Sequence, residues 1–296
     1  MKYDTISLSI EEVSKMILVT SAAGNTGKVI ARGLVDAGFE VAVTDINPKV
    51  RDLPGIKKAF VGDLTDLSFI NQILSEVNQI IFIPPLFSSQ EALIGKQLID
   101  SSIEKGIEQF IFISVIHPIL STLLQHTAKR DIEEHLIYRG METQLSYTIL
   151  QPMHYMHNFN PEPVLKTGEY RIFYDINSSV AYVDTEDVAE VVVSVISDRK
   201  KHNKATYELV GTQAYSPNDL VKIFNKIFNE KASAVFVPVN EFLDQIGAND
   251  LYFRKGFEYL AYSYSTWGLD GNSNTLSMLL GRKPTTFEEY LEKYKG

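Results

Sequence analysis

The sequence predicts an α/β fold in which a doubly wound parallel sheet is followed by a smaller C-terminal α/β lobe. Short runs that are apolar throughout alternate with amphipathic stretches, and this rhythm becomes less regular after Gln151-Pro152. Apolar strands that alternate with helices are typical of a parallel sheet covered on both faces. We expect residues 1–15 to be an N-terminal extension, 16–152 the sheet domain, and 153–296 mainly the lobe, with about 178–198 returning to the sheet domain.

The first half of the chain contains six predicted strands, and the first should lie centrally in the sheet. Gly38 ends the first helix, and Pro84-Pro85 stops the fourth strand. The predicted strands are 16–20, 41–45, 59–61, 79–83, 109–114 and 147–150, and the helices are 25–37, 66–77, 91–105 and 121–139.

The second half should form a lobe over the carboxyl ends of the sheet. A helix is predicted at 185–197, where Asp184 or Thr185 can cap its start and Glu186 and Asp187 suit its positive end. The other predicted elements are strands at 169–174, 205–210 and 234–237, a helix at 217–229, and two further helical stretches.

Composition excludes several classes of protein. A formal charge of −9 argues against direct nucleic-acid binding, which needs a basic face. The absence of cysteine excludes disulfides, thiolate metal sites and cysteine nucleophiles, and fits a reducing compartment. No run approaches the roughly 18 apolar residues of a membrane helix, and residues 1–15 do not resemble a signal peptide. We therefore expect a cytoplasmic protein that does not bind membranes.

The turn after the first strand predicts a dinucleotide site of the Rossmann type. Gly24 and Gly27 stand where the last two glycines of G-x-G-x-x-G would fall, and Ser21, Asn25 and Thr26 complete the turn and the helix start. Free N–H groups at a helix start bind a pyrophosphate. A P-loop is excluded, because position 29 is a valine where serine or threonine must hold magnesium.

An acid at the end of the second strand favours NAD over NADP. Asp45 lies where a carboxylate would accept hydrogen bonds from the adenosine ribose. It would repel a 2′-phosphate by about 1–4 kcal/mol per charge pair. Lys28, Lys49 and Arg51 can offset part of that repulsion, so NADP remains possible. The alternative is that Asp45 only starts a turn.

Several segments, taken in order, carry a family resemblance. They are TSAAGNTG at 20–27, GDLTD at 62–66, FIFIS at 110–114, HTAKRDIEE at 126–134, YTILQP at 147–152, GLDGNSN at 268–274 and LLGRKPTTF at 279–287. This order resembles the NmrA-like group of atypical short-chain dehydrogenases, which includes quinone-reductase-like NAD(P)-binding proteins. The family turn usually reads T-G-x-T-G-x-x-G, so Ser21 departs from it. Ile46 stands where many relatives place an arginine for NADP, which again favours NAD.

The resemblance implies further cofactor contacts. Asp63 and Leu64 would flank the adenine, and Pro84 would pass beside the nicotinamide ribose. Lys129 would reach the ribose hydroxyls, and Gln151 and Pro152, with Tyr155, would close the nicotinamide end. The alternatives are a turn residue at Asp63, a strand stop at Pro84, and a solvent-reaching lysine at 129.

The sequence leaves the catalytic residues unidentified. None of the 15 tyrosines has a lysine four residues later, which excludes the Tyr-x-x-x-Lys dyad of typical short-chain dehydrogenases. Lys129, His126 and Tyr155 remain candidates, and His117 is a candidate pocket residue. His154 and His157 have a spacing that suits a metal, but no third ligand is apparent, so we expect no metal site.

Two functions fit these features. The first is an NAD(P)H-dependent reductase of quinones or similar electrophiles, with Phe87, Tyr155 and Phe159 lining a pocket for an apolar or aromatic acceptor. The second is a non-catalytic redox sensor that binds the dinucleotide and reports to a protein partner. We favour the reductase.

Overall fold

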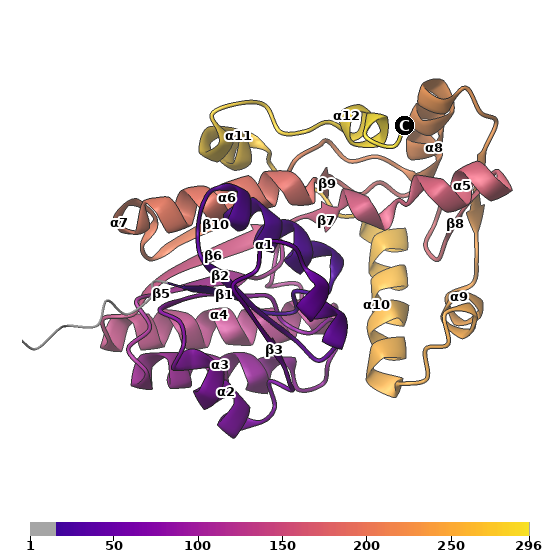
Figure 1. The fold of residues 1–296 in the computed structure, drawn as a ribbon. Coiled ribbons are helices and arrows are strands. Elements are labelled where there is room, and N and C mark those ends of the chain that lie inside the picture. Colours follow the sequence, from indigo (N-terminus) through magenta and orange to yellow (C-terminus); the bar gives the residue numbers. More distant parts are fainter. Residues whose placement is uncertain (1–15, 296) are drawn as a thin grey trace, which may run out of the picture.

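The computed structural model describes residues 16–295, and the predicted N-terminal extension lies outside this range. Within it, a parallel sheet has the order β10-β6-β5-β4-β1-β2-β3, which confirms the doubly wound α/β fold, with β1 inside the sheet between β4 and β2 (Figure 1). The strands are β1 (Ile17–Val19), β2 (Val41–Asp45), β3 (Lys58–Val61), β4 (Gln79–Phe82), β5 (Gln109–Ile113), β6 (Ser146–Pro152) and β10 (Ala205–Leu209).

Helices cover both faces of this sheet. Side chains alternate along β1, so that Ile17 and Val19 join one buried cluster and Leu18 joins the other. The first face carries α1 (Asn25–Asp36) and α6 (Thr185–Ser197), which pack together. The second carries α2 (Leu67–Leu74), α3 (Glu91–Glu104) and α4 (Leu124–Glu142). Apolar side chains are therefore buried on both faces of the sheet, which explains the apolar runs of β1, β4 and β5.

The strand predicted at 205–210 was expected to belong to the lobe, and this assignment is wrong. It is β10, and it pairs in parallel with β6 at the edge of the main sheet instead of joining the lobe. The short helix α7 (Arg199–His202) leads into it. A short apolar run is compatible with either sheet, because pairing depends on a partner far away in the chain.

The lobe is built from small sheets and helices beside the carboxyl edge. The strand pairs are β8 (Glu169–Ile172) with β11 (Ser233–Phe236) and β7 (His154–Tyr155) with β9 (Tyr182–Val183). The helices are α5 (Pro161–Thr167), α8 (Pro217–Phe228), α9 (Val239–Gln245), α10 (Leu251–Trp267), α11 (Asn274–Leu280) and α12 (Phe287–Glu292). Two single turns of 3-10 helix, η1 (Pro48–Asp52) and η2 (Met156–Asn158), complete the chain.

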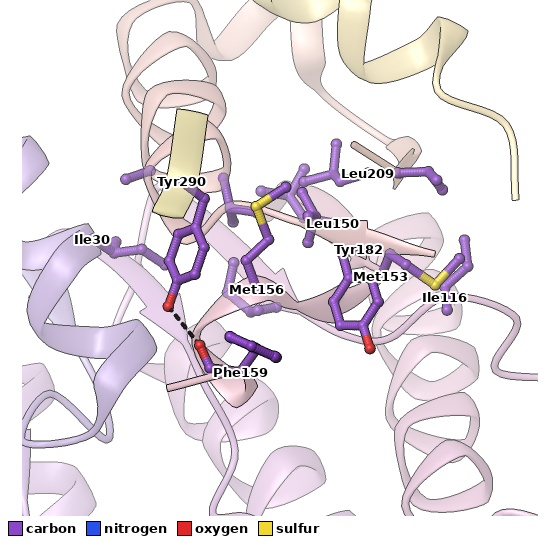
Figure 2. Close-up of a cluster of buried hydrophobic side chains, with 14 of the residues drawn as sticks. Ile30, Ile116, Leu150, Met153, Met156, Phe159, Tyr182, Leu209 and Tyr290 are labelled. Atoms are coloured by element: carbon purple, nitrogen blue, oxygen red, sulfur yellow. Dashed lines mark hydrogen bonds between the residues drawn. The ribbon is translucent and has the colours of Figure 1, made fainter. Parts of the chain in front are cut away.

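A buried cluster joins the lobe to the sheet domain. Figure 2 shows Met153, Met156 and Phe159, which follow β6, packed with side chains from both parts of the chain. The Tyr290 hydroxyl of α12 donates a hydrogen bond to the carbonyl oxygen of Phe159 over 3.1 Å. The two parts therefore share one core. No helix in residues 16–295 has the length and apolar character needed to cross a membrane.

Candidate functional site

The candidate site is the carboxyl edge of the sheet around β1, β2 and β4. The order of connection reverses between β1 and β4, and ligands of open α/β sheets bind at such a point. The turn after β1, the end of β2, and the loops after β4, β5 and β6 all meet this edge.

Hydrogen bonds fix the turn after β1 to the end of β4. The Ser21 and Thr20 hydroxyls each donate to the carbonyl oxygen of Ile83 over 2.8 Å, and the Ile83 N–H donates back to Thr20 Oγ1 over 2.8 Å. Ser21 has a φ of +49°, a left-handed conformation that favours glycine. The departure from the family turn therefore keeps the glycine-like backbone, with a hydroxyl that ties it down.

The start of α1 leaves its first N–H groups available. Gly24 is the N-cap residue, and no side chain caps the helix. A Cβ atom on Gly27 would lie 2.4 Å from the Ser21 carbonyl oxygen, so only glycine lets the helix pack so closely on the turn. The Lys28 ammonium donates to Asn25 Oδ1 over 3.0 Å at the exposed rim. The predicted turn residues thus lie together around a helix start suited to an anion.

Asp45 holds the same turn from β2. Its Oδ2 accepts a hydrogen bond from the Ala23 N–H and its Oδ1 accepts one from the Asn47 N–H, each over 2.9 Å. Ile46 beside it is 72% exposed. The carboxylate therefore starts a turn, as in the alternative interpretation, while it also lies next to the glycine turn.

The other residues predicted near the adenine lie after β3. Asp63 is exposed and accepts a hydrogen bond from the Thr65 N–H over 2.8 Å, and Leu64 is half-buried. Asp63 is therefore a turn residue, and it lies at the carboxyl edge of the sheet where the adenine contact was expected.

Lys129 lies on α4 and is almost fully buried. Its ammonium donates to Glu91 Oε1, at the start of α3, over 2.5 Å. Burial raises the pKa of Glu91, while the charge and hydrogen bond of Lys129 oppose that rise. Among the described residues, Glu91 Oε2 has no hydrogen-bond partner. The lysine is thus held inside the protein and does not reach into solvent.

Gln151 belongs to a second buried polar group. Its Nε2 donates to both oxygens of Glu133 over 2.9 and 3.0 Å, and the Ser114 hydroxyl donates to Glu133 Oε1. Burial raises the pKa of Glu133, whose hydrogen-bond partners among residues 16–295 include no cation. Pro152, the last residue of β6, is also buried. The Gln151 side chain therefore braces β6 against α4.

The loop after β4 is fastened to the lobe. Phe87, at a φ of +50°, packs edge-to-face against Phe253 and at a tilt against Phe257 of α10, with centroid distances of 5.4 and 4.9 Å. Its ring also lies against Gly256, where a Cβ atom would come within 2.4 Å of it. Pro84, earlier in this loop, is buried. Phe87 is therefore covered by α10. The prediction that it lines an open acceptor pocket is wrong.

The aromatic residues after β6 have separate surroundings. Phe159 is fully buried against Tyr170, Phe224 and Phe287, so it belongs to the core and not to an acceptor pocket. Tyr155 is half-buried, and its phenol oxygen has no partner of good hydrogen-bond geometry among residues 16–295. Burial raises the pKa of the Tyr155 phenol far above its usual value, and the nearby Thr26 side chain opposes this only in part.

His126, His154 and His157 are neutral near pH 7 and already have hydrogen-bond partners. Burial lowers the pKa of His126 to about 4, and its Nδ1 lies 3.1 Å from the carbonyl oxygen of His117. Burial likewise lowers the pKa values of His154 and His157 to about 4. His154 contacts Asn158 and Tyr264 through its two ring nitrogens. No cluster of three or more potential metal ligands occurs within residues 16–295.

Two hollows lie away from this edge. One, of about 840 Å³, runs between α1, α6 and residues 282–293, where Arg282 pairs with Asp187 and Glu190. The other, of about 450 Å³, lies at the opposite edge of the sheet, near Arg199 and Asn203. Neither contains a residue that the sequence analysis selected for the cofactor.

Sequence reasoning missed Glu91, Ser114 and Glu133. Glu91 resembles an ordinary acid in the first turn of a helix, and its partner lies 38 residues further along the chain. Glu133 could have been selected from the sequence only weakly. It follows Lys129 by one helical turn and therefore lies on the same face of α4.

Comparisons with known proteins agree with this architecture. The model of the NmrA-like family matches residues 13–291. The photosystem II assembly factor Ycf39 of Cyanophora paradoxa is 26% identical over 255 residues, which cover 81% of this chain and 77% of the relative. The NADPH-dependent quinone oxidoreductase QOR2 of Escherichia coli, solved with NADPH, superposes with a TM-score of 0.76 at 22% identity, covering 95% of this chain and 100% of that one. The negative transcriptional regulator NmrA, solved with NAD, superposes with a TM-score of 0.73 at 17% identity, covering 94% of each chain.

Proposed function

The chain belongs to the NmrA-like family, and from this premise we propose that it binds a nicotinamide dinucleotide and uses it to reduce a small apolar acceptor. The observation that carries the proposal is the turn between β1 and α1. Gly27 packs directly on Ser21, the first N–H groups of α1 are uncapped by any side chain, and Asp45 holds the turn from the next strand. A pyrophosphate would bind at the helix start, and the adenosine ribose beside Asp45.

The carboxylate of Asp45 and the apolar Ile46 favour NAD over NADP. A 2′-phosphate would meet a negative charge at Asp45 and no cation at position 46, whereas a free 2′-hydroxyl can donate to the carboxylate. QOR2 was solved with NADPH, and NmrA was solved both with NAD and with NADP. The fold therefore accommodates either dinucleotide, and the side chains at 45 and 46 are what support NAD for this chain.

The acceptor would lie at the same edge, between the loops after β4 and β5. Leu86 and Ile119 on these loops are 68% and 76% exposed, and an apolar acceptor would cover them. Reduction of a quinone adds a hydride and a proton to give the hydroquinone, while the nicotinamide is oxidised. The bound cofactor supplies the hydride. QOR2 is described as a quinone oxidoreductase, which supports this class of acceptor.

Of the three candidate proton donors, Lys129 fits best. Tyr155 holds its proton too tightly, because burial raises its pKa and no lysine lies beside it on the chain. His126 is neutral near pH 7, since its pKa is lowered to about 4. The Lys129 ammonium has one protein partner, Glu91, among the described residues, which leaves two N–H groups for a ligand oxygen.

The test follows the absorbance of NADH and NADPH with the purified protein and a panel of quinones. We expect turnover that is faster with NADH than with NADPH. Tight dinucleotide binding without turnover of any acceptor would contradict the reductase.

A second function, a redox sensor, is favoured by the missing Tyr-x-x-x-Lys dyad. NmrA, described as a negative transcriptional regulator, has the same fold. A sensor must bind the oxidised and reduced cofactors with different affinities, because equal binding shifts no equilibrium. Titrating both forms against the protein, in the absence of turnover, distinguishes this function from the first.

A further inference from the structure

The pair formed by Glu91 and Lys129 is the most deeply buried ion pair with a lysine in the part of the chain that the structure describes. Two side-chain oxygens near it have no hydrogen-bond partner there, Glu91 Oε2 and Gln125 Oε1. Gln125 precedes Lys129 by one turn of α4. Buried acceptors normally find partners, so these two oxygens suit a ligand group that can donate a hydrogen bond, such as a hydroxyl.

The place of the pair in the fold links it to the proposed site. Glu91 opens α3, directly after the loop that leaves β4, and Lys129 lies in the first half of α4, after the loop that leaves β5. These are the two loops that carry Leu86 and Ile119. The pair therefore lies under the part of the carboxyl edge where the nicotinamide and the acceptor would meet.

A buried ammonium needs a fixed counter-charge to remain in place. Lysine otherwise extends its stem so that the charged end reaches water. Glu91 accepts one of its three N–H groups, and the other two have no protein partner among the described residues. A ligand oxygen with free lone pairs, such as a ribose hydroxyl or the carbonyl oxygen of an acceptor, fits these donors.

We propose that Glu91 is a positioning residue, which holds the Lys129 ammonium at the carboxyl edge so that its two remaining N–H groups bind an oxygen of the cofactor or acceptor. This inference rests on the proposed function. Protonation of Glu91 removes the counter-charge, and the lysine then turns away from the edge. Ligand affinity therefore falls as the pH is lowered through the Glu91 titration.

The groups around Glu91 determine the pH range in which ligand affinity is lost. Lys129 faces it from α4 and Tyr252 from α10, and His126 lies beside Lys129. His126 is neutral above about pH 5, because its pKa is lowered to about 4. Burial raises the pKa of Glu91, so the acid limb should lie above the pH range of an ordinary glutamate.

The experiment measures the NADH dissociation constant by fluorescence between about pH 5 and pH 8. The wild-type protein should lose affinity toward the acid end. Glu91→Gln should bind about tenfold more weakly at pH 8 and show no acid limb, because the amide does not titrate. Glu91→Asp keeps the charge on a shorter stem, so it should keep the limb with reduced affinity.

Asp187→Asn is the matched control. Asp187 is a buried carboxylate on α6 that accepts hydrogen bonds from Arg282 and Thr285, away from the site. Its loss should lower thermal stability but leave the acid limb of NADH binding unchanged. An acid limb that disappears in both variants would mean that any loss of buried charge has this effect, and would overturn the proposal.

Removing one partner of a buried pair can prevent folding, so a double variant completes the set. Glu91→Gln combined with Lys129→Met removes both charges and should fold, since neutral replacements of buried pairs are often tolerated. It should also lack the limb. If Glu91→Gln or the double variant retained the acid limb, the proposed role of Glu91 would be overturned, while the proposed function would still stand. Failure of the wild-type protein to bind NADH or NADPH at any pH would overturn the proposed function as well.

Discussion

Replacing Gly27 by alanine tests the turn on which the proposed cofactor site depends. The added Cβ would lie 2.4 Å from the Ser21 carbonyl oxygen and 2.7 Å from Ala22 Cα. Cβ atoms essentially never approach closer than 3.0 Å, so α1 must move away from the turn by about 0.6 Å. Both opposing atoms belong to the backbone, and a rotamer change cannot relieve the contact.

The cost follows from overpacking. Forcing extra volume into a packed site costs about 1–3 kcal/mol, and the better helix propensity of alanine returns at most about 1 kcal/mol. We expect a net loss of about 1–2 kcal/mol in the free energy of unfolding and NADH binding at least tenfold weaker, because the displaced N–H groups no longer converge on the pyrophosphate. Chemical denaturation and fluorescence titration measure the two quantities.

Two further glycine variants of this region separate stability from binding. A Cβ on Gly24 would lie 3.2 Å from the Ser21 carbonyl oxygen, and the φ of −75° suits any residue. Gly24→Ala should therefore fold with nearly wild-type stability but bind NADH weakly, since its Cβ occupies space needed by the pyrophosphate. Gly33→Ala, which faces Ala189 at 3.3 Å, should change neither quantity much. Wild-type stability and affinity in Gly27→Ala would refute the reasoning.

Two carboxylates give the remaining predictions. Asp45→Ala removes the acceptor of two backbone N–H groups, so it should lower the free energy of unfolding by about 1–2 kcal/mol, as measured by chemical denaturation. It should also reduce the preference for NADH over NADPH in paired titrations. Unchanged affinities for both dinucleotides would remove Asp45 from the site. Burial raises the pKa of Glu133, so between the pH range of an ordinary glutamate and that raised value the folded protein holds more protons than the unfolded chain, and stability falls as pH rises. Glu133→Gln should flatten this fall in denaturation experiments at several pH values, and an unchanged slope would contradict the assignment.

Local pattern was enough to predict the central architecture. The inner strands β1, β2 and β5 are buried on both faces, so each is mostly apolar, and α1 and α4 follow β1 and β5 along the chain. The helix at Thr185–Ser197 was also predicted at its observed bounds, because its cap and first-turn acids are encoded within a few residues. These signals are local in the chain, and the structure follows them.

Contacts between distant residues were not predictable in the same way. The run that forms β10 gives no indication that its partner is β6, which lies more than 50 residues earlier. Phe87 is an apolar aromatic residue of the kind that often lines a pocket. Its ring instead packs against Gly256 on α10, a contact between residues far apart in the chain. Lys129 was identified by its resemblance to the family, whereas its partner Glu91 was not, because a glutamate at a helix start already has a sufficient local explanation.

The two halves of the proposed site are built differently, and this difference bears on specificity. The dinucleotide side would be formed by backbone groups and by Asp45, which two hydrogen bonds already hold against the turn, so little ordering would remain when the cofactor binds. The acceptor side combines Lys129, which keeps two N–H groups free of protein partners in the described chain, with the exposed Leu86 and Ile119. Those groups gain most from a ligand that is apolar and carries an oxygen near the lysine. Under this proposal, selection among acceptors would depend on the loops after β4 and β5 and on α10, which holds the β4 loop through Phe87. The choice of dinucleotide would depend on β1, α1 and β2.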